Sequence, residues 1–99
     1  LPSYLHLLSS FLDSHGNDAE LLRRARQDNQ LENAHRLAHN LKGVAGTLGL
    51  TDIARAAAAL NASLHDAEPA ANALPMFVAL ENAIDDTCRA LRPHLAERH

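Results

Sequence analysis

The chain of 99 residues carries a net charge of −3 and is 46% hydrophobic but only 3% aromatic. That length supports one small domain with a single core, and an excess of alanine and leucine over valine, isoleucine and threonine argues against a sheet-rich fold. The acidic balance gives no electrostatic basis for binding nucleic acid. A lone cysteine, Cys88, excludes an internal disulfide and a cysteine-based zinc site, and fits a reducing compartment.

Hydrophobic residues near the start recur every three or four positions, as they do on one face of an amphipathic helix. They are Leu1, Tyr4, Leu5, Leu8, Phe11 and Leu12. The polar run at residues 14–17 is expected to end this helix. Asn17 followed by Glu20 has the spacing of a capping box, which predicts a short second helix. The residues expected to be buried in it are Leu21, Leu22 and Ala25.

Asn29 and Glu32 repeat the capping spacing and predict a third helix from about residue 30 to Leu48. Its apolar face consists of Leu31, Ala34, Leu37, Ala38, Leu41, Ala45 and Leu48. Gly49 is placed to end this helix in the left-handed conformation, and Leu50 is the hydrophobic residue that commonly follows such a glycine.

A fourth helix is expected to start at Thr51 or Asp52, with an apolar stripe of Ile53, Ala57, Leu60 and Leu64. Residues 66–72 include Pro69 and predict a linker. The stripe of the last helix is Leu74, Phe77, Leu80, Ile84, Cys88 and Leu91, and Pro93 should end or kink it. Because short turns favour antiparallel neighbours, we expect an all-α, antiparallel up-and-down four-helix bundle with an additional short helix, in one domain over residues 1–99.

The third predicted helix carries Gly43 and Gly46 in its interior, although each glycine costs about 1 kcal/mol there relative to alanine. At about 100° per residue, His39 lies opposite the apolar face of this helix. Gly43 and Gly46 follow His39 by one and two turns, and Lys42 stands three residues after it. The outward face therefore combines a nucleophilic imidazole, a cation that can offset phosphoryl charge, and two positions without a side chain.

The run His39-Asn40-Leu41-Lys42-Gly43-Val44-Ala45-Gly46-Thr47-Leu48-Gly49, preceded by Ala38, resembles the signature of histidine-containing phosphotransfer (HPt) domains. That signature is a histidine, then Leu-Lys-Gly, a small residue and a closing glycine. The flanking helices also fall where the family has them. The resemblance implies that His39 is phosphorylated, that Lys42 is the cation beside the phosphate, and that Gly43 and Gly46 lie under the docking partner.

Two further residues complete the expected site. Family members often carry Glu or Gln at the position of Asn61, where the side chain can hold the other nitrogen of the phosphorylated histidine. The resemblance therefore makes Asn61 a candidate for orienting the His39 imidazole, with a shorter amide. His35 lies one turn before His39 and is interpreted as a rim residue of the docking surface.

The resemblance implies a phosphorelay intermediate that exchanges a phosphoryl group between His39 and receiver-domain aspartates. The partners would be the receiver domains of a hybrid kinase and of a response regulator. No cofactor is expected in this domain, because the receiver would supply Mg²⁺. The sequence contains neither of the common glycine-rich nucleotide motifs, so the domain is not expected to be an enzyme with its own ATP site.

The chain begins with Leu1 rather than Met, which leads us to expect a piece of a longer protein. The C-terminal module of a hybrid sensor histidine kinase is the expected setting. No secretory signal or membrane-spanning run is recognised. We expect a cytoplasmic, monomeric domain that makes no membrane contact itself.

Two alternatives remain open. One is an adaptor bundle that binds a signalling partner without chemistry. The other is a metal-binding bundle, because Glu32-Asn33-Ala34-His35 has the form of one Glu-x-x-His element, but a di-metal bundle needs a second element and two more glutamates. Residues interpreted as surface or terminal are His6, His15, His65, His94 and His99. Those interpreted as a solvated basic face are Arg23, Arg24 and Arg26, and Cys88 is interpreted as a small core residue.

Overall fold

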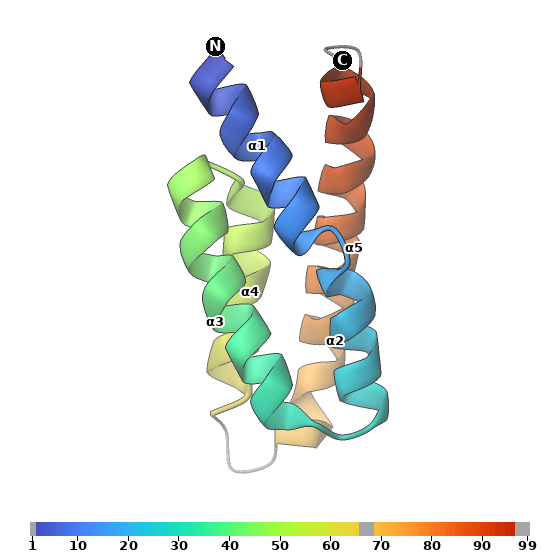
Figure 1. Cartoon of the computed structure of the whole chain (residues 1–99). Coiled ribbons are helices and arrows are strands. Elements are labelled where there is room, and N and C mark those ends of the chain that lie inside the picture. Colours follow the sequence, from blue (N-terminus) through green and yellow to red (C-terminus); the bar gives the residue numbers. More distant parts are fainter. Residues whose placement is uncertain (1, 66–68, 97–99) are drawn as a thin grey trace.

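The computed structural model describes residues 2–65 and 69–96, and this part of the chain forms five helices and no strand. The helices are α1 (Pro2–His15), α2 (Asp18–Gln27), α3 (Leu31–Leu48), α4 (Thr51–Ser63) and α5 (Pro69–Ala96). In Figure 1, α1 and α2 descend one after the other, and α3, α4 and α5 then run alternately up, down and up. The expected all-α, antiparallel arrangement is confirmed.

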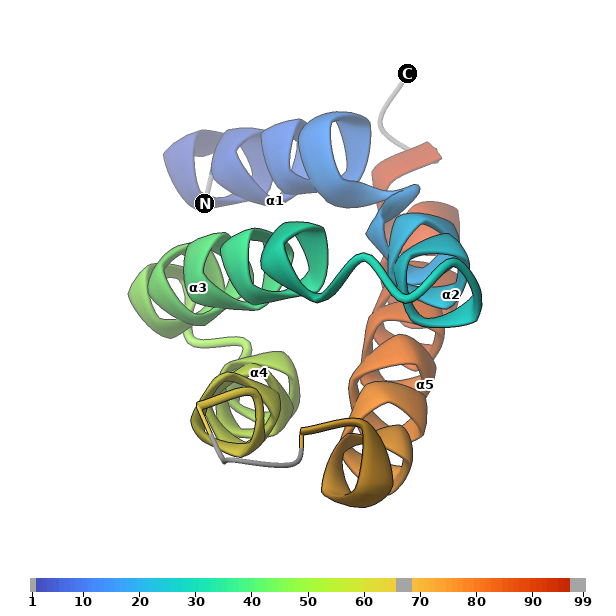
Figure 2. The same cartoon turned by 90° about the horizontal axis from the view of Figure 1, so that it is seen from below.

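Helices α2 to α5 make up the four-helix bundle. Viewed along its length in Figure 2, α3 and α4 lie on one side, and α2 and α5 lie on the other. The shortest helix, α2, belongs to the four because it packs against both α3 and α5. Helix α1 is the additional helix, and it lies beyond the N-terminal end of α2, where it contacts α5 and borders α3.

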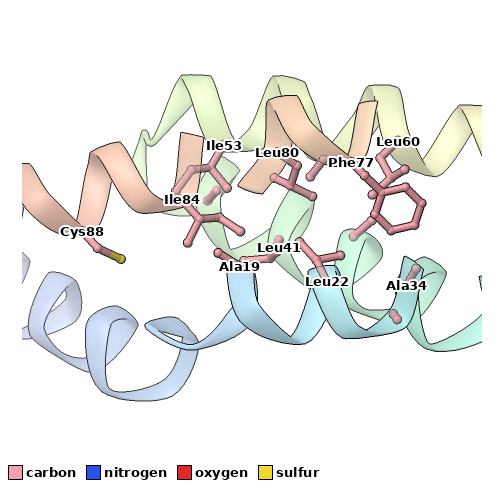
Figure 3. Packing of buried hydrophobic residues seen from close by; sticks show 14 of the residues in the cluster. Ala19, Leu22, Ala34, Leu41, Ile53, Leu60, Phe77, Leu80, Ile84 and Cys88 are labelled. Atoms are coloured by element: carbon pink, nitrogen blue, oxygen red, sulfur yellow. The ribbon is translucent and has the colours of Figure 1, made fainter. Parts of the chain in front are cut away.

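The core is filled by aliphatic side chains and Phe77 that meet between the four bundle helices (Figure 3). Leu22 of α2, Leu41 of α3 and Leu60 of α4 are completely buried, and burial of each such side chain contributes about 1.5–3 kcal/mol. Apart from Leu41 and Leu48, the buried residues of α3 are small alanines, which let its neighbours approach closely. This packing holds α3 in a fixed orientation, and so it also fixes the direction in which the outward face of α3 points.

Three residues of the predicted apolar stripes are exposed. Leu21 and Leu74 are 43% and 52% exposed, because each lies beside the buried stripe of its helix, and Tyr4 of α1 is 44% exposed. The inward positions are taken by Ala19 in α2 and Ala73 in α5. Cys88 is buried in the cluster, as expected.

The turns at both ends of α3 are closed by left-handed residues. Gly49 has φ 75°, and the N–H of Leu50 donates to the Ala45 carbonyl at 2.8 Å, which is the expected glycine cap. Asn29 was expected to start α3, but it has φ 56° and terminates α2 instead, with the N–H of Gln30 donating to the Ala25 carbonyl at 2.7 Å. Asparagine is the residue that most readily replaces glycine in this conformation.

Other boundaries differ from the predictions in detail. Asn17 stands at the N-cap of α2 as predicted, but its side chain makes no capping hydrogen bond. The linker predicted over 66–72 is wrong for residues 69–72, which belong to α5, since proline is well suited to the first position of a helix. Residues 66–68 lie outside the described part. Pro93 does not end α5, which continues to Ala96.

Helices α2 and α5 are joined by ion pairs, so the interpretation of Arg23 and Arg26 as a solvated face is wrong. Arg26 binds both carboxylate oxygens of Glu81 at 2.8 and 3.2 Å, and Arg23 binds Asp85 at 2.5 Å. Glu81 is only 2% exposed, and its hydrogen bond raises the pKa of Arg26. These contacts add a directional link to the apolar packing of α2.

Candidate functional site

His39 lies on the outward face of α3, where its side chain is exposed. Leu41 and Ala38 beside it in the sequence are buried, and this burial holds the outward face in place. Neither Gly43 nor Gly46 has any atom of another element within 4 Å of the place where a Cβ would lie. Close packing inside the bundle therefore does not explain these two glycines. They leave open space beside the imidazole.

A groove between α1 and α3 runs past His39. It has a volume of about 800 Å³, and its lining includes His39 and Gly43 from α3 and Leu7 from α1. Leu7 is 50% exposed, so the α1 wall of the groove presents an apolar side chain to solvent. The hydroxyl of Tyr4 donates to the Leu48 carbonyl at 2.8 Å and ties the two helices together at one end. His39 therefore lies at the edge of a groove that a partner can enter.

The other side of His39 faces α4. Around the helix, Lys42 and His35 lie on this side, away from the α1 groove. His35 does not stand alone, because its Nε2 is 3.1 Å from Nε2 of His65 and the two rings meet edge to face. His65 is exposed, as expected of a surface residue, but it has a partner in His35. Lys42 is exposed and makes no ion pair with the described residues.

Asn61 lies at the level of His39. Because α3 and α4 are antiparallel and His35 contacts His65, moving one turn along each helix places His39 opposite Asn61. The Oδ1 atom of Asn61 is buried and has no hydrogen-bond partner within the described ranges. No hydrogen bond joins it to His39 in this part of the structure. Asn61 is thus at the level of the expected site, and its amide oxygen has no partner in this part of the chain.

Most residues that line the groove were not predicted as part of the site, and His15 is the ionisable one among them. His15, the last residue of α1, lines the same groove as His39, and its Nδ1 is 2.8 Å from Oδ2 of the buried Asp18. The interpretation of His15 as a surface residue is therefore incomplete, because its side chain is 22% exposed and is paired with Asp18. Its only signal in the sequence is an aspartate three residues later, and that spacing becomes a contact because the chain turns between α1 and α2.

The described residues contain no cluster of three or more His, Cys, Asp or Glu side chains with the geometry of a metal site. His35 and His39 are one turn apart, but the contact that His35 makes is with His65. This part of the chain therefore provides no set of ligands that supports the metal-binding alternative. None of its helices combines the length and the apolar character needed to cross a bilayer.

Comparisons with known proteins agree with the geometry. The family model for the Hpt domain matches residues 6–92, which is most of the chain and includes the whole of α2, α3 and α4. Neither the curated proteins nor the solved structures give a match. Hpt domains are phosphotransfer modules rather than kinases, and they exchange phosphoryl groups with receiver domains in two-component signalling. The chain belongs to this Hpt domain family.

Proposed function

We propose that this domain is a phosphorelay intermediate in which His39 carries the phosphoryl group. The observation that supports the proposal best is the exposed position of His39 on a rigidly packed helix, beside Gly43 and the α1 groove. A nucleophile held on a packed helix needs little reorganisation when its partner docks. Another protein can approach this imidazole closely, because no side chain projects from the position one turn away.

The transfer step follows from the chemistry of the two groups. An unprotonated ring nitrogen of His39 attacks the phosphorus of a receiver aspartyl phosphate. The bond from phosphorus to the aspartate oxygen breaks, and the carboxylate leaves. The other ring nitrogen keeps its proton and takes up positive charge. The reverse reaction passes the phosphoryl group to the aspartate of a second receiver, and the metal ion that assists transfer belongs to the receiver.

Two neighbours of His39 have complementary parts in this step. Lys42 is exposed on the α4 side of His39 and can neutralise part of the negative charge of the phosphoryl group. The unpaired Oδ1 of Asn61 is an acceptor for the proton on the second ring nitrogen. That hydrogen bond would strengthen as the ring becomes positive.

The docking surface that we propose for the receiver consists of the α1 groove together with Gly43 and Gly46. Its apolar part includes Leu7 and Val44, and its polar edge is His39. A mixture of apolar contact area with a few placed polar groups is typical of specific protein interfaces. His35 lies on the far side of His39 with His65 and would form the rim.

We place the domain in the cytoplasm, as part of a hybrid sensor histidine kinase, with that kinase's own receiver and a response regulator as its two partners. The test is to phosphorylate a panel of receiver domains from the source genome with acetyl phosphate and to follow the label onto the domain. We expect a label that is labile in acid and stable in alkali, and its loss in His39→Gln. His6→Gln, which removes an exposed histidine of α1, is the matched control.

The outcomes separate the candidate functions. Labelling that persists in His39→Gln would move the site to another histidine, and His35 is the first to test. Binding of receivers without any labelling of the wild type would favour the non-catalytic adaptor bundle. Comparing the rates with which each receiver donates and accepts the label gives the direction of flow.

A further inference from the structure

His15 and Asp18 form a fixed pair where α1 turns into α2. The Nδ1 atom of His15 lies 2.8 Å from Oδ2 of Asp18, and the His15 ring also packs against Phe11 with 5.3 Å between the ring centres. Asp18 is only 5% exposed, so its carboxylate is held in place by its surroundings. The imidazole is therefore restrained on two sides.

The pair lies across the groove from His39. Helix α1 descends while α3 ascends (Figure 1), and the hydrogen bond from Tyr4 to Leu48 joins their upper ends. Counting equal numbers of turns down both helices from that contact brings His15 to the turn of α3 that contains His39. The presence of both histidines in the lining of one groove agrees with this count.

The hydrogen bond to Asp18 determines which atom of His15 can meet a partner. Because Nδ1 is occupied by the carboxylate, only Nε2 remains for an incoming group. A protonated imidazole is a donor at both nitrogens, and a hydrogen bond from such a ring to a phosphate or carboxylate oxygen is among the stronger kinds. The partner's aspartate and the phosphoryl group are both anionic. Their chemistry matches this donor.

We infer that His15 is a docking residue for the anionic phosphorylation site of the receiver, and that Asp18 is the residue that positions it. The inference rests on the proposed function. Lys42 lies on the α4 side of His39 and His15 lies on the α1 side, so the two side chains lie on opposite sides of the phosphoryl group. A residue that acts on docking changes the concentration of receiver needed, whereas a purely structural pair changes only stability.

Charged groups of α5 and an ionisable group of α3 lie near the pair. From α5, the guanidinium of Arg92 comes within 3.5 Å of the position that a Cβ on Gly16 would occupy, and Asp85 is the nearby acidic residue of that helix. From α3, the ionisable side chain of the groove is His39 itself. Arg92 does not line the groove. It therefore does not replace His15 there.

The experiment compares His15→Gln, His15→Lys, Asp18→Asn and the control His6→Gln. Each is titrated with the phosphorylated receiver that labels the wild type fastest, and the half-saturating concentration and maximal rate are measured separately. We expect His15→Gln to raise the half-saturating concentration about three- to five-fold, the effect of one solvent-accessible polar contact to an anion, with little change in maximal rate. A cationic donor at this position in His15→Lys should recover most of the loss, and Asp18→Asn should fall between wild type and His15→Gln.

A small phosphodonor distinguishes this inference from the function on which it rests. Phosphoramidate can label a histidine without any docking surface, so it should label His15→Gln and wild type equally. If neither phosphoramidate nor any receiver labels the wild type, the proposed function itself fails. If the wild type is labelled and His15→Gln has the same half-saturating concentration as His6→Gln, the docking role of His15 is overturned, even if Asp18→Asn is too unstable to measure.

Discussion

His35 of α3 and His65, which follows the end of α4, meet with 3.1 Å between their Nε2 atoms, and this contact sets the level at which Asn61 stands opposite His39. Neither histidine needs to take part in phosphotransfer for the contact to matter. It indicates that Asn61, whose amide oxygen is buried and has no partner among the described residues, lies at the level of the candidate nucleophile. A buried polar atom without a partner costs about 1–3 kcal/mol, which is a cost that a binding site can carry for its function.

Asn61→Leu should therefore stabilise the fold and weaken the site. Replacing the amide by an apolar side chain of similar size removes the unpaired oxygen, and we expect the free energy of unfolding to rise by about 1 kcal/mol. Transfer to His39 should become slower, because the acceptor for the second ring nitrogen is lost. Urea unfolding and the transfer rate from one receiver measure the two effects. A variant that is neither more stable nor slower would leave Asn61 as an ordinary half-buried amide.

Helical stripes and the phosphotransfer motif could be read from the sequence, because both depend on residues that are close together along the chain. The periodicity that placed Leu41 inside also placed His39 outside, and the left-handed cap at Gly49 followed from a single residue type. Such local features can be predicted without knowledge of the tertiary structure. They were sufficient to predict the bundle and to identify the candidate nucleophile.

Contacts between distant residues could not be read in this way. Arg26 and Glu81 are 55 positions apart, and their pairing depends on how α2 lies against α5. The sequence around Asn29 fits two roles, the N-cap of α3 and the left-handed residue that ends α2. The conformation of the turn between the two helices decides which role Asn29 takes. The pairing of His15 with Asp18 likewise needs the direction of the turn after α1, which spacing alone does not contain.

Substitutions at three glycines should separate docking from folding. Gly43→Ala should raise the free energy of unfolding by up to about 1 kcal/mol, because alanine favours a helix and the added Cβ meets nothing. Gly43→Leu should keep the fold but raise the receiver concentration needed for transfer. Gly46→Leu extends the test to the next turn. Gly16→Ala should destabilise the domain, because its Cβ would lie 2.5 Å from the Leu12 carbonyl oxygen.

Thermal melts and receiver titrations of these variants give independent measurements. If Gly43→Leu has the same half-saturating receiver concentration as the wild type, the receiver does not dock over this part of α3. A large loss of stability in Gly43→Ala would contradict the open space found beside it.

Removal of the Lys42 charge should slow phosphotransfer without abolishing it. The nucleophile remains in Lys42→Ala, but part of the phosphoryl charge is no longer offset, and the lifetime of the phosphohistidine should also change. Lys42→Arg should keep part of the effect, because the charge survives on a larger and differently hydrated group. The transfer rates of the three proteins are compared with one receiver at fixed Mg²⁺ and at two salt concentrations. Equal rates would identify Lys42 as an ordinary surface charge.

The buried thiol of Cys88 should make the free energy of unfolding depend on pH in the alkaline range. Burial raises the pKa of its thiol above the ordinary value, partly opposed by the nearby Arg92. In the unfolded chain a cysteine ionises near pH 8.5, so above that pH the unfolded state loses a proton that the folded state still holds. The stability that comes from this difference is fully present below about pH 8.5 and is lost as the pH rises towards the folded pKa.

Urea unfolding at pH 7.5, 9.0 and 10.0 tests this dependence, with Cys88→Ala as the matched variant. At pH 7.5 the variant should be less stable by about 1 kcal/mol, because a buried sulfur is replaced by a small cavity. The wild type should then lose more stability than Cys88→Ala as the pH rises, since only the wild type carries the buried thiol, while every other titrating group is common to both. Iodoacetamide should modify Cys88 slowly until the domain unfolds, because the residue is only 3% exposed. Parallel pH profiles for the two proteins, together with rapid alkylation of the native state, would show that the thiol is not held in the core in solution.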